Sequence, residues 1–403
     1  MLAVPLIAIV VLDATPFQVG LLGGAQFLPF LLISLPAGAI VDRLTRQRLL
    51  LVSADIARAV CLLSVPLAYA TGLLSFAQLY IVAFVNGVLT VFFDVTANAI
   101  LPTLVTRSEL VDGNSKLELS RSGAQIVGPG IAGLLIELAS APFALAADAV
   151  SFLASGTLLA TIRGKSPAAI PPRDGGRVAS LPREVLEGMR FVFSHPYLRA
   201  IALTTTTANF FRSALLAVLL VYLVREADAS VGAIGAAFAV GNIGFVVAAL
   251  IAPTVTRRYG LGRTMRAAVS LFGPAALLVA LAPLRLAILA TGCMILVDGF
   301  GIGLHGVNQV SLRQAATPER LRGRMTATLR FLNFGTMPLG TTLGGAVASL
   351  IGLHQAIWIF ALGLFLAALP YSVSSTRRLI ELPEPSEDAL PTQVAGLLDR
   401  RAR

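Results

Sequence analysis

The stretch AGAIVDRLTRQRLLLV, residues 37–52, places a short group of charged side chains between two apolar segments. The charged residues follow an almost wholly apolar run and are Asp42, Arg43, Arg46 and Arg48. Leucines resume directly after them, as expected for a tight loop between two membrane-spanning helices. The meaning of these charges therefore depends on whether the rest of the chain alternates in the same way.

The composition assigns the chain to the membrane class. Of its 403 residues, 56% are hydrophobic and 13% are charged, whereas a soluble domain carries about 25% charged residues. The mean hydropathy is +0.82, and several apolar runs exceed the roughly 18 residues that indicate a membrane-spanning helix. The sequence therefore predicts an all-α polytopic membrane protein.

Charged or Pro/Gly-rich breaks divide the apolar runs into about twelve predicted spans. They lie at residues 1–12, 17–41, 49–70, 76–101, 117–139, 142–162, 199–224, 231–255, 265–282, 286–311, 326–351 and 354–375. We therefore expect an N-terminal six-helix bundle at 1–162, a cytoplasmic linker at 163–198, a C-terminal six-helix bundle at 199–375 and a cytoplasmic tail at 376–403.

The positions of the basic residues account for the net charge of +10. If the loop at 42–48 is cytoplasmic, the loops on the opposite side contain only Arg225 and Arg285 as basic residues. This asymmetry follows the positive-inside rule. It predicts a multi-pass protein of the bacterial cytoplasmic membrane with both termini inside, and it argues against nucleic acid as a partner.

The two halves of the chain are weakly similar. VGLLGGAQFLPFLLISLPAGAIVDRLTRQR at 19–48 is echoed by VGAIGAAFAVGNIGFVVAALIAPTVTRRYGLGR at 231–263. GPGIAGLL at 128–135 is echoed by MPLGTTLGGAV at 337–347. Repeats of this kind are typical of transporters that are built from two bundles related by a pseudo-twofold axis.

Two segments differ from a regular membrane-spanning helix. REVLEGMRFVFS at 183–194 has the periodicity of an amphipathic helix, which we expect to lie flat on the inner membrane surface. The alternative is a tether with one fortuitous helical turn.

The first span, Met1 to Leu12, supplies only about 18 Å of helix for a hydrocarbon core of roughly 30 Å. We therefore expect that the first helix is truncated and that the sequence starts inside the true first span.

The opening stretch resembles the signature between the second and third helices of the major facilitator superfamily. The matching residues are Gly38, Asp42, Arg43, Arg46 and Arg48, and Thr45 stands where the signature usually has glycine. The resemblance implies a twelve-helix fold of two six-helix bundles, close helix packing at Gly38, and a gate in which Asp42 and Arg43 hold the cytoplasmic ends together. The alternative is an ordinary positive-inside loop.

A second motif resembles the glycine–proline signature of exporters and antiporters in that superfamily. It lies in the fifth span and comprises Gly128, Pro129, Gly130 and Gly133. Proline removes a backbone hydrogen bond and bends the helix, and the glycines permit tight packing against a neighbour. The resemblance implies a sealed, bent fifth helix that favours export, whereas the alternative is a generic helix kink.

Residues 101–135 and 187–200 resemble the transmembrane secretion effector branch, which includes the enterobactin exporter and macrolide efflux proteins. The resemblance implies a secondary active exporter of a small amphipathic molecule of drug or siderophore type, driven by proton antiport through alternating access. A lysophospholipid-type flippase and a transport-dead sensor or partner protein are the alternatives. We expect a monomer in the lipid bilayer, with no enzymatic activity and no cofactor or metal, since Cys61 and Cys293 lack metal-ligand spacing.

Charged residues at bilayer depth are expensive unless they pair or line a cavity. One set predicts a charged layer beneath the cytoplasmic gate and consists of Asp55, Arg58, Asp94 and Arg121. It is either a structural network or, through Asp94, a proton-coupling site. A second set either lines the cavity or bonds to helix backbones, and consists of Asn209, His305, Asn308 and Asn333.

Arg212 and Asp298 both lie near the bilayer centre when residues are counted from the helix ends. A lone charge at that depth is costly, so we expect the two side chains to pair across the central cavity. Protonation of Asp298 would then release Arg212 for an anionic group of the cargo. The alternative is a static pair that holds the C-terminal bundle together.

Overall fold

The computed structural model describes residues 3–41, 44, 46–104, 110–161 and 181–380. In this part of the chain every regular element is a helix. The α-helices are α1 (Ala3–Val10), α2 (Pro16–Val41), α3 (Gln47–Ala70), α4 (Phe76–Leu104), α5 (Leu110–Ala139), α6 (Ala141–Thr161), α7 (Leu181–Ser194), α8 (Pro196–Arg225), α9 (Val231–Tyr259), α10 (Leu261–Ser270), α11 (Phe272–Leu281), α12 (Ala287–Ala315), α13 (Glu319–Ile351), α14 (Leu353–Phe365) and α15 (Leu369–Val373). Short 3₁₀ helices lie at Leu284–Leu286, Leu366–Ala368 and Ser375–Arg378.

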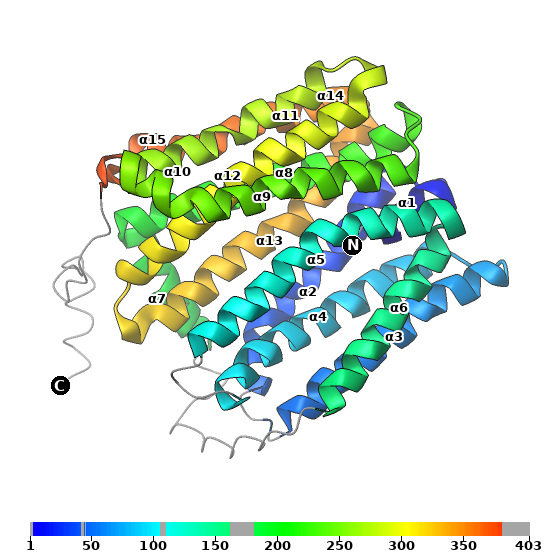
Figure 1. Ribbon diagram of the computed structural model, residues 1–403, viewed down its shortest axis with the longest axis horizontal. Coiled ribbons are helices and arrows are strands. Elements are labelled where there is room, and N and C mark those ends of the chain that lie inside the picture. Colours follow the sequence, from blue (N-terminus) through cyan, green and yellow to red (C-terminus); the bar gives the residue numbers. More distant parts are fainter. Residues whose placement is uncertain (1–2, 42–43, 45, 105–109, 162–180, 381–403) are drawn as a thin grey trace.

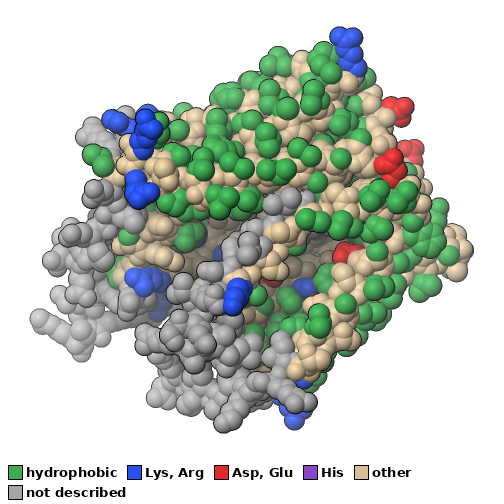
Figure 2. Space-filling model, in the orientation of Figure 1, with side chains coloured by type: hydrophobic (Ala, Val, Ile, Leu, Met, Phe, Trp, Pro, Cys, Tyr) green, Lys and Arg blue, Asp and Glu red, His purple; other side chains and the backbone are tan. Residues whose placement is uncertain are grey.

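A helix lies at each predicted span, and α10 with α11 and α14 with α15 form interrupted spans. Among the described residues, 10 segments are long and apolar enough to cross a membrane. The others are α1, with 8 residues, and α5, whose apolar part is Val127–Ala139. Leu250 and Leu350 are 75% and 84% exposed, and Figure 2 shows hydrophobic side chains over the outer helix faces. Such a surface requires lipid, so the chain is a multi-pass membrane protein.

Several helices start earlier than hydropathy predicts. α5 starts at Leu110 rather than 117, α10 at Leu261 rather than 265, and α13 at Glu319 rather than 326. Each continues past the apolar segment into charged turns, which still form backbone hydrogen bonds although they no longer register as hydrophobic. α9 runs to Tyr259 and stops at Gly260, whose φ of 82° is a left-handed conformation that glycine adopts without steric cost.

The spans form two groups. We call α1–α6 the N-terminal group and α8–α15 the C-terminal group. In Figure 1, α3, α4 and α6 lie in the lower part and α9, α11 and α14 in the upper part. The two groups meet where α2 packs on α13 and where α5 packs on α9.

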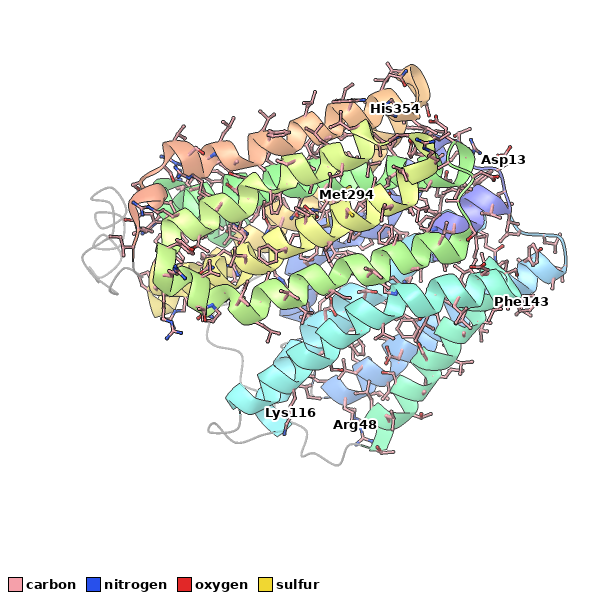
Figure 3. All side chains as sticks on the ribbon, turned by 45° about the horizontal axis from the view of Figure 1, so that its top comes forward. Asp13, Arg48, Lys116, Phe143, Met294 and His354 are labelled. Carbon is pink, nitrogen blue, oxygen red and sulfur yellow. The ribbon has the colours of Figure 1, made fainter. Side chains whose placement is uncertain are left out.

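The molecule has two distinct ends, both visible in Figure 3. The short-loop end carries the brief connections after α1, α5 and α13, and Asp13, Phe143 and His354 mark it. The linker end carries the starts of α3, α5 and α7, and Arg48 and Lys116 mark it. These two names are used below without reference to the side of the membrane.

The linker helix α7 is present as predicted, and part of its apolar face is covered by protein. Phe191 and Val192 are buried in a cluster with Leu198, Ala202, Leu321, Met325 and Leu329. Glu187 forms an ion pair of 2.8 Å with Arg324 of α13. The expectation that this helix lies flat on a membrane surface stays a prediction, because Leu186 of the same helix is 49% exposed and periodicity does not show what covers an apolar face.

Candidate functional site

At the short-loop end, α2 and α13 touch backbone to backbone. A Cβ added to Gly20 would lie 2.9 Å from the Cα of Gly345. The backbone N–H of Phe17 donates to the hydroxyl of Ser349 across the same contact, at 3.1 Å. These contacts join the N-terminal group to the C-terminal group and close this end of the α2–α13 pair.

The α5–α9 pair is closed at the same end by the glycine–proline motif. A Cβ on Gly133 would lie 2.8 Å from the Cα of Gly235, and a Cβ on Gly235 would lie 2.7 Å from the carbonyl oxygen of Pro129. A Cβ on Gly130 would be 3.2 Å from the Cβ of Ala239. Three of the four predicted motif residues therefore face α9, as helix contacts between small residues require.

Toward the linker end the helices are further apart. Cβ atoms added to Gly123 and Gly128 of α5, or to Gly323 of α13, would meet no atom of the described residues within 4 Å. Leu117 of α5 is 54% exposed. Figure 2 shows this face hollowed between the upper and lower helices. In the described part of the chain, the two groups are thus closed at the short-loop end and separated at the linker end.

The gating motif is only partly described. Gly38 lies within α2, whereas Asp42 and Arg43 fall outside the described residues. Arg46 is exposed and precedes α3. Arg48 donates through Nη2 to the carbonyl oxygen of Ala160, which ties the start of α3 to the end of α6. The gating role of the motif stays a prediction.

Arg212 and Asp298 form the ion pair that the sequence predicts. Arg212 donates from Nε and Nη2 to the two carboxylate oxygens at 2.8 and 2.7 Å. Its guanidinium carbon also lies 4.5 Å from the ring centroid of Phe272. These residues belong to α8, α12 and α11, so the pair lies within the C-terminal group and not across a cavity between the groups. Counting from a helix end gives depth, but it does not show which neighbour a side chain faces.

A second ion pair lies inside the N-terminal group. Arg58 donates from Nη1 to Asp55 at 3.0 Å and from Nη2 to the carbonyl oxygen of Leu89 at 3.1 Å. Its guanidinium carbon lies 4.6 and 5.2 Å from the ring centroids of Phe93 and Phe152. Asp55 and Arg58 are 1% and 4% exposed, so they connect α3 to α4 and α6 inside one group.

The other two members of the predicted charged layer have different positions. Asp94 of α4 is half-buried and interacts electrostatically with Arg58. Arg121 lies in α5, and its side chain is outside the described part. The predicted layer therefore resolves, where it is described, into a compact cluster around Arg58. Its function, structural or proton-coupling, stays open.

Asn209 and Asn333 join α8 to α13. The Asn209 side-chain amide donates to the backbone carbonyl of Asn333 at 3.4 Å. The Thr205 hydroxyl donates to the side-chain oxygen of Asn333 at 2.7 Å. Both asparagines are half-buried, and the structure gives them helix-to-helix hydrogen bonds.

His305 and Asn308 of α12 are buried. His305 Nε2 lies 2.9 Å from the hydroxyl oxygen of Tyr371. The Asn308 amide donates to the carbonyl of Leu304, and its side-chain oxygen accepts from the Thr256 hydroxyl, each at 2.8 Å. These contacts favour the second of the two predicted roles, in which His305 and Asn308 hold helices in position and do not line the cavity.

Sequence reasoning missed one ion pair between the groups. Arg225, at the end of α8, pairs with Asp13 in the α1–α2 connection at 2.5 Å. In this connection Asp13 adopts a left-handed backbone conformation, with a φ of 51°. One sequence feature could have predicted this pair: Arg225 is one of only two basic residues in the predicted outer loops. The spacing Gly20-x-x-x-Gly24 likewise indicated a close helix contact on α2.

His195 lies at the junction of α7 and α8 and is 8% exposed. Its ring centroid is 6.1 Å from that of Phe191 and 5.4 Å from that of Tyr197. Its Nδ1 atom has no hydrogen-bond partner among the described residues. Burial in this aromatic setting lowers the pKa of His195, because the charged imidazolium would lose its hydration.

Known proteins resemble this chain over nearly its whole length. A family profile described as transmembrane secretion effector matches residues 7–401. The multidrug efflux pump Tap of Mycolicibacterium fortuitum is 29% identical over 350 residues, which cover 85% of this chain and 83% of that protein. The staphyloferrin A transporter of Staphylococcus aureus is 22% identical over 365 residues, which cover 91% and 89%.

Solved structures share the fold. A nucleoside transporter superposes with a TM-score of 0.71 at 14% identity, covering 92% of this chain and 94% of that one. A bacterial homologue of the iron transporter ferroportin, described as inward-facing, has a TM-score of 0.69 at 18% identity, covering 92% and 93%. At these identities the likeness establishes the fold alone, and it confirms the all-α architecture predicted from the sequence.

Proposed function

Because the chain belongs to the transmembrane secretion effector family and has the major facilitator fold, we propose that it is a secondary active exporter of a small amphipathic molecule. The names of two relatives support this, since one is called a multidrug efflux pump and the other a staphyloferrin A transporter. The fold alone would not choose a cargo, because one fold serves many. The proposal is therefore export of a drug-type or siderophore-type molecule by a monomer.

The observation that carries the proposal is the one-sided closure of the α2–α13 and α5–α9 pairs. Alternating access requires a state in which cargo enters from one side while the other side is shut. The positive-inside rule assigns the linker end to the cytoplasm and the short-loop end to the outside. On this assignment both termini are cytoplasmic in a bacterial inner membrane, and the described conformation accepts cargo from the cytoplasm.

Proton antiport would drive the cycle. The bundles at 1–162 and 199–375 would rock against each other, with the linker at 163–198 and the tail at 376–403 on the cytoplasmic side. Asp42 and Arg43 would lock the linker end in the opposite state, while Gly133 seals the short-loop end in this one. Asp94 and Asp298 are the candidate proton acceptors, since both lie in spans near an arginine.

Efflux from intact cells tests export and its coupling. Cells that lack their own pumps are loaded with ethidium, with a neutral dye and with an anionic dye, and dye loss is followed with and without this protein. We expect faster loss of at least one dye, abolished by a protonophore. Export that persists without a proton gradient would contradict proton antiport but not export itself. If the protein changes the loss of none of the dyes, the proposal that it is an exporter is wrong.

Cross-linking tests alternating access. In a background with Cys61→Ala and Cys293→Ala, we would introduce Phe17→Cys and Ser349→Cys, whose native atoms Phe17 N and Ser349 Oγ are 3.1 Å apart. A short bifunctional maleimide should join them and stop transport. Each single cysteine variant is the matched control. Transport that continues at full rate in the joined protein would show that the short-loop end need not open.

A further inference from the structure

A cavity of about 170 Å³ lies inside the C-terminal group, beside the Arg212–Asp298 pair. Its walls come from α8, α9, α11, α12 and α14, which all belong to the C-terminal group. The side chains of Phe238, Phe272 and Met294 line it. Aromatic faces and a thioether of this kind favour a planar ring as the occupant.

The polar edge of the cavity contains a hydrogen-bond donor group that the described residues do not use. Arg212 uses Nε and Nη2 for Asp298, and this engages both carboxylate oxygens. Its Nη1 amino group makes no hydrogen bond with any residue of the described part. The Arg212 side chain is 16% exposed and lines the cavity. An acceptor atom on an occupant would therefore find a donor at this wall.

The charge at the edge is already balanced. A carboxylate on the occupant would approach Arg212 but would also lie beside Asp298, and an ammonium group would meet the reverse situation. Either ion would lose its hydration in an apolar space without an unshared counter-charge. A neutral acceptor such as a carbonyl oxygen avoids this cost.

We propose that this cavity is a binding subsite for a neutral planar aromatic group that carries a hydrogen-bond acceptor. The proposal rests on the proposed export of a small amphipathic molecule and names the part of that molecule which the C-terminal group would hold. Sites for whole drug-sized ligands occupy about 300–1,000 Å³. A cavity of about 170 Å³ therefore suits one ring system and not an entire cargo.

Fluorine NMR on the purified full-length protein in lipid nanodiscs tests the ligand class. The probes are 4-fluoroacetophenone, 4-fluoroethylbenzene, 4-fluorobenzoate and 4-fluorobenzylamine, each corrected for its signal with empty nanodiscs. We expect acetophenone to bind with millimolar affinity, about threefold or more tighter than the other three probes. Tighter binding of the anion or the cation would overturn the assigned class.

Two matched variants on α11 test the location. Ala276→Phe fills the cavity, since Ala276 lines it, whereas Leu278→Phe changes a nearby side chain that is 40% exposed. We expect binding of 4-fluoroacetophenone to weaken by about fivefold or more in the first and to stay unchanged in the second. If Ala276→Phe does not fold, Leu216→Phe fills the same cavity from α8. Equal binding to filled and unfilled protein would overturn the proposal.

The donor is tested by replacing the ion pair as a unit. Arg212→Met combined with Asp298→Leu leaves no uncompensated charge, and it should erase the preference for acetophenone over ethylbenzene. A preference that survives would overturn the role of Arg212. The dye-efflux assay keeps the two proposals apart, because probe binding without any export would contradict the proposed function, and export without probe binding would contradict the subsite.

Discussion

Gly133 on α5 and Gly235 on α9 meet backbone to backbone, so that a Cβ on Gly133 would lie only 2.8 Å from the Cα of Gly235. The two residues are far apart in the sequence and belong to different helix groups. Their contact makes the closure of the short-loop end depend on the absence of a side chain at either position. Four residues before Gly133 comes Pro129, whose carbonyl oxygen faces the same glycine of α9.

Gly133→Ala should therefore reduce export by about tenfold, because α5 and α9 would have to separate to admit the new methyl group. Gly128→Ala belongs to the same motif and is the matched control, since its Cβ would meet no described atom within 4 Å. Initial rates of dye efflux at equal expression measure both. A larger loss in Gly128→Ala than in Gly133→Ala would be incompatible with this closure.

Breaking the Arg212–Asp298 pair from one side should destabilise the protein by up to about 3 kcal/mol, because it leaves a half-buried charge without its counter-charge. Arg212→Gln and Asp298→Asn are measured singly and together by denaturation of the purified protein. We expect the double variant to lose clearly less than the sum of the single losses. Additive losses would mean that the two side chains act independently.

The same variants separate coupling from scaffolding. If Asp298 carries the exchanged proton, Asp298→Asn should abolish proton-driven export while substrate still exchanges down its own gradient. Inverted vesicles with an imposed pH difference measure this directly. Proton-driven export that continues in Asp298→Asn would make the pair purely structural.

The stability of the α7–α8 junction should fall in mild acid. Because burial lowers the pKa of His195, the unfolded chain takes up a proton near pH 6.5 while the folded one does not. The contribution is fully present above about pH 6.5 and is lost as the pH falls toward the lowered pKa, at up to about 1.4 kcal/mol per pH unit. Thermal unfolding between pH 8 and pH 5 should therefore show a steeper decline for the native protein than for His195→Asn. Equal slopes would contradict a buried neutral histidine.

Asp42→Asn should slow transport while leaving substrate affinity within a few-fold, if Asp42 acts at the gate and does not contact cargo. In the sequence, Asp42 directly follows Val41, the last residue of α2, and in the proposed cycle the linker end closes when the short-loop end opens. Efflux rate and equilibrium binding of the same dye are measured on this variant. Closure of the linker end is monitored by cross-linking. If substrate affinity collapses while this closure is unchanged, Asp42 takes part in substrate binding and not in the gate.

The positions of the helices along the chain could be predicted from sequence because the bilayer imposes a strong and local rule. Each span must bury its own backbone hydrogen bonds within a helix and present apolar side chains to lipid. A window of residues is therefore enough to locate it, and the glycine and charge motifs mark where helices can approach or where loops turn. The helical ends were misplaced where this rule stops acting, as at Leu110 and Glu319.

Contacts between helices do not follow from this local rule, and only the tertiary structure decided them. Sequence reasoning paired Arg212 with Asp298 through the cost of isolated charge, but the helix rotations that place the pair inside the C-terminal group depend on packing against α11 and α14. The covering of Phe191 by α13 and the meeting of Gly133 with Gly235 have the same origin. By itself the sequence determined depth, charge and the apolar face of each helix. Which neighbour each face meets was decided by close packing of segments distant along the chain.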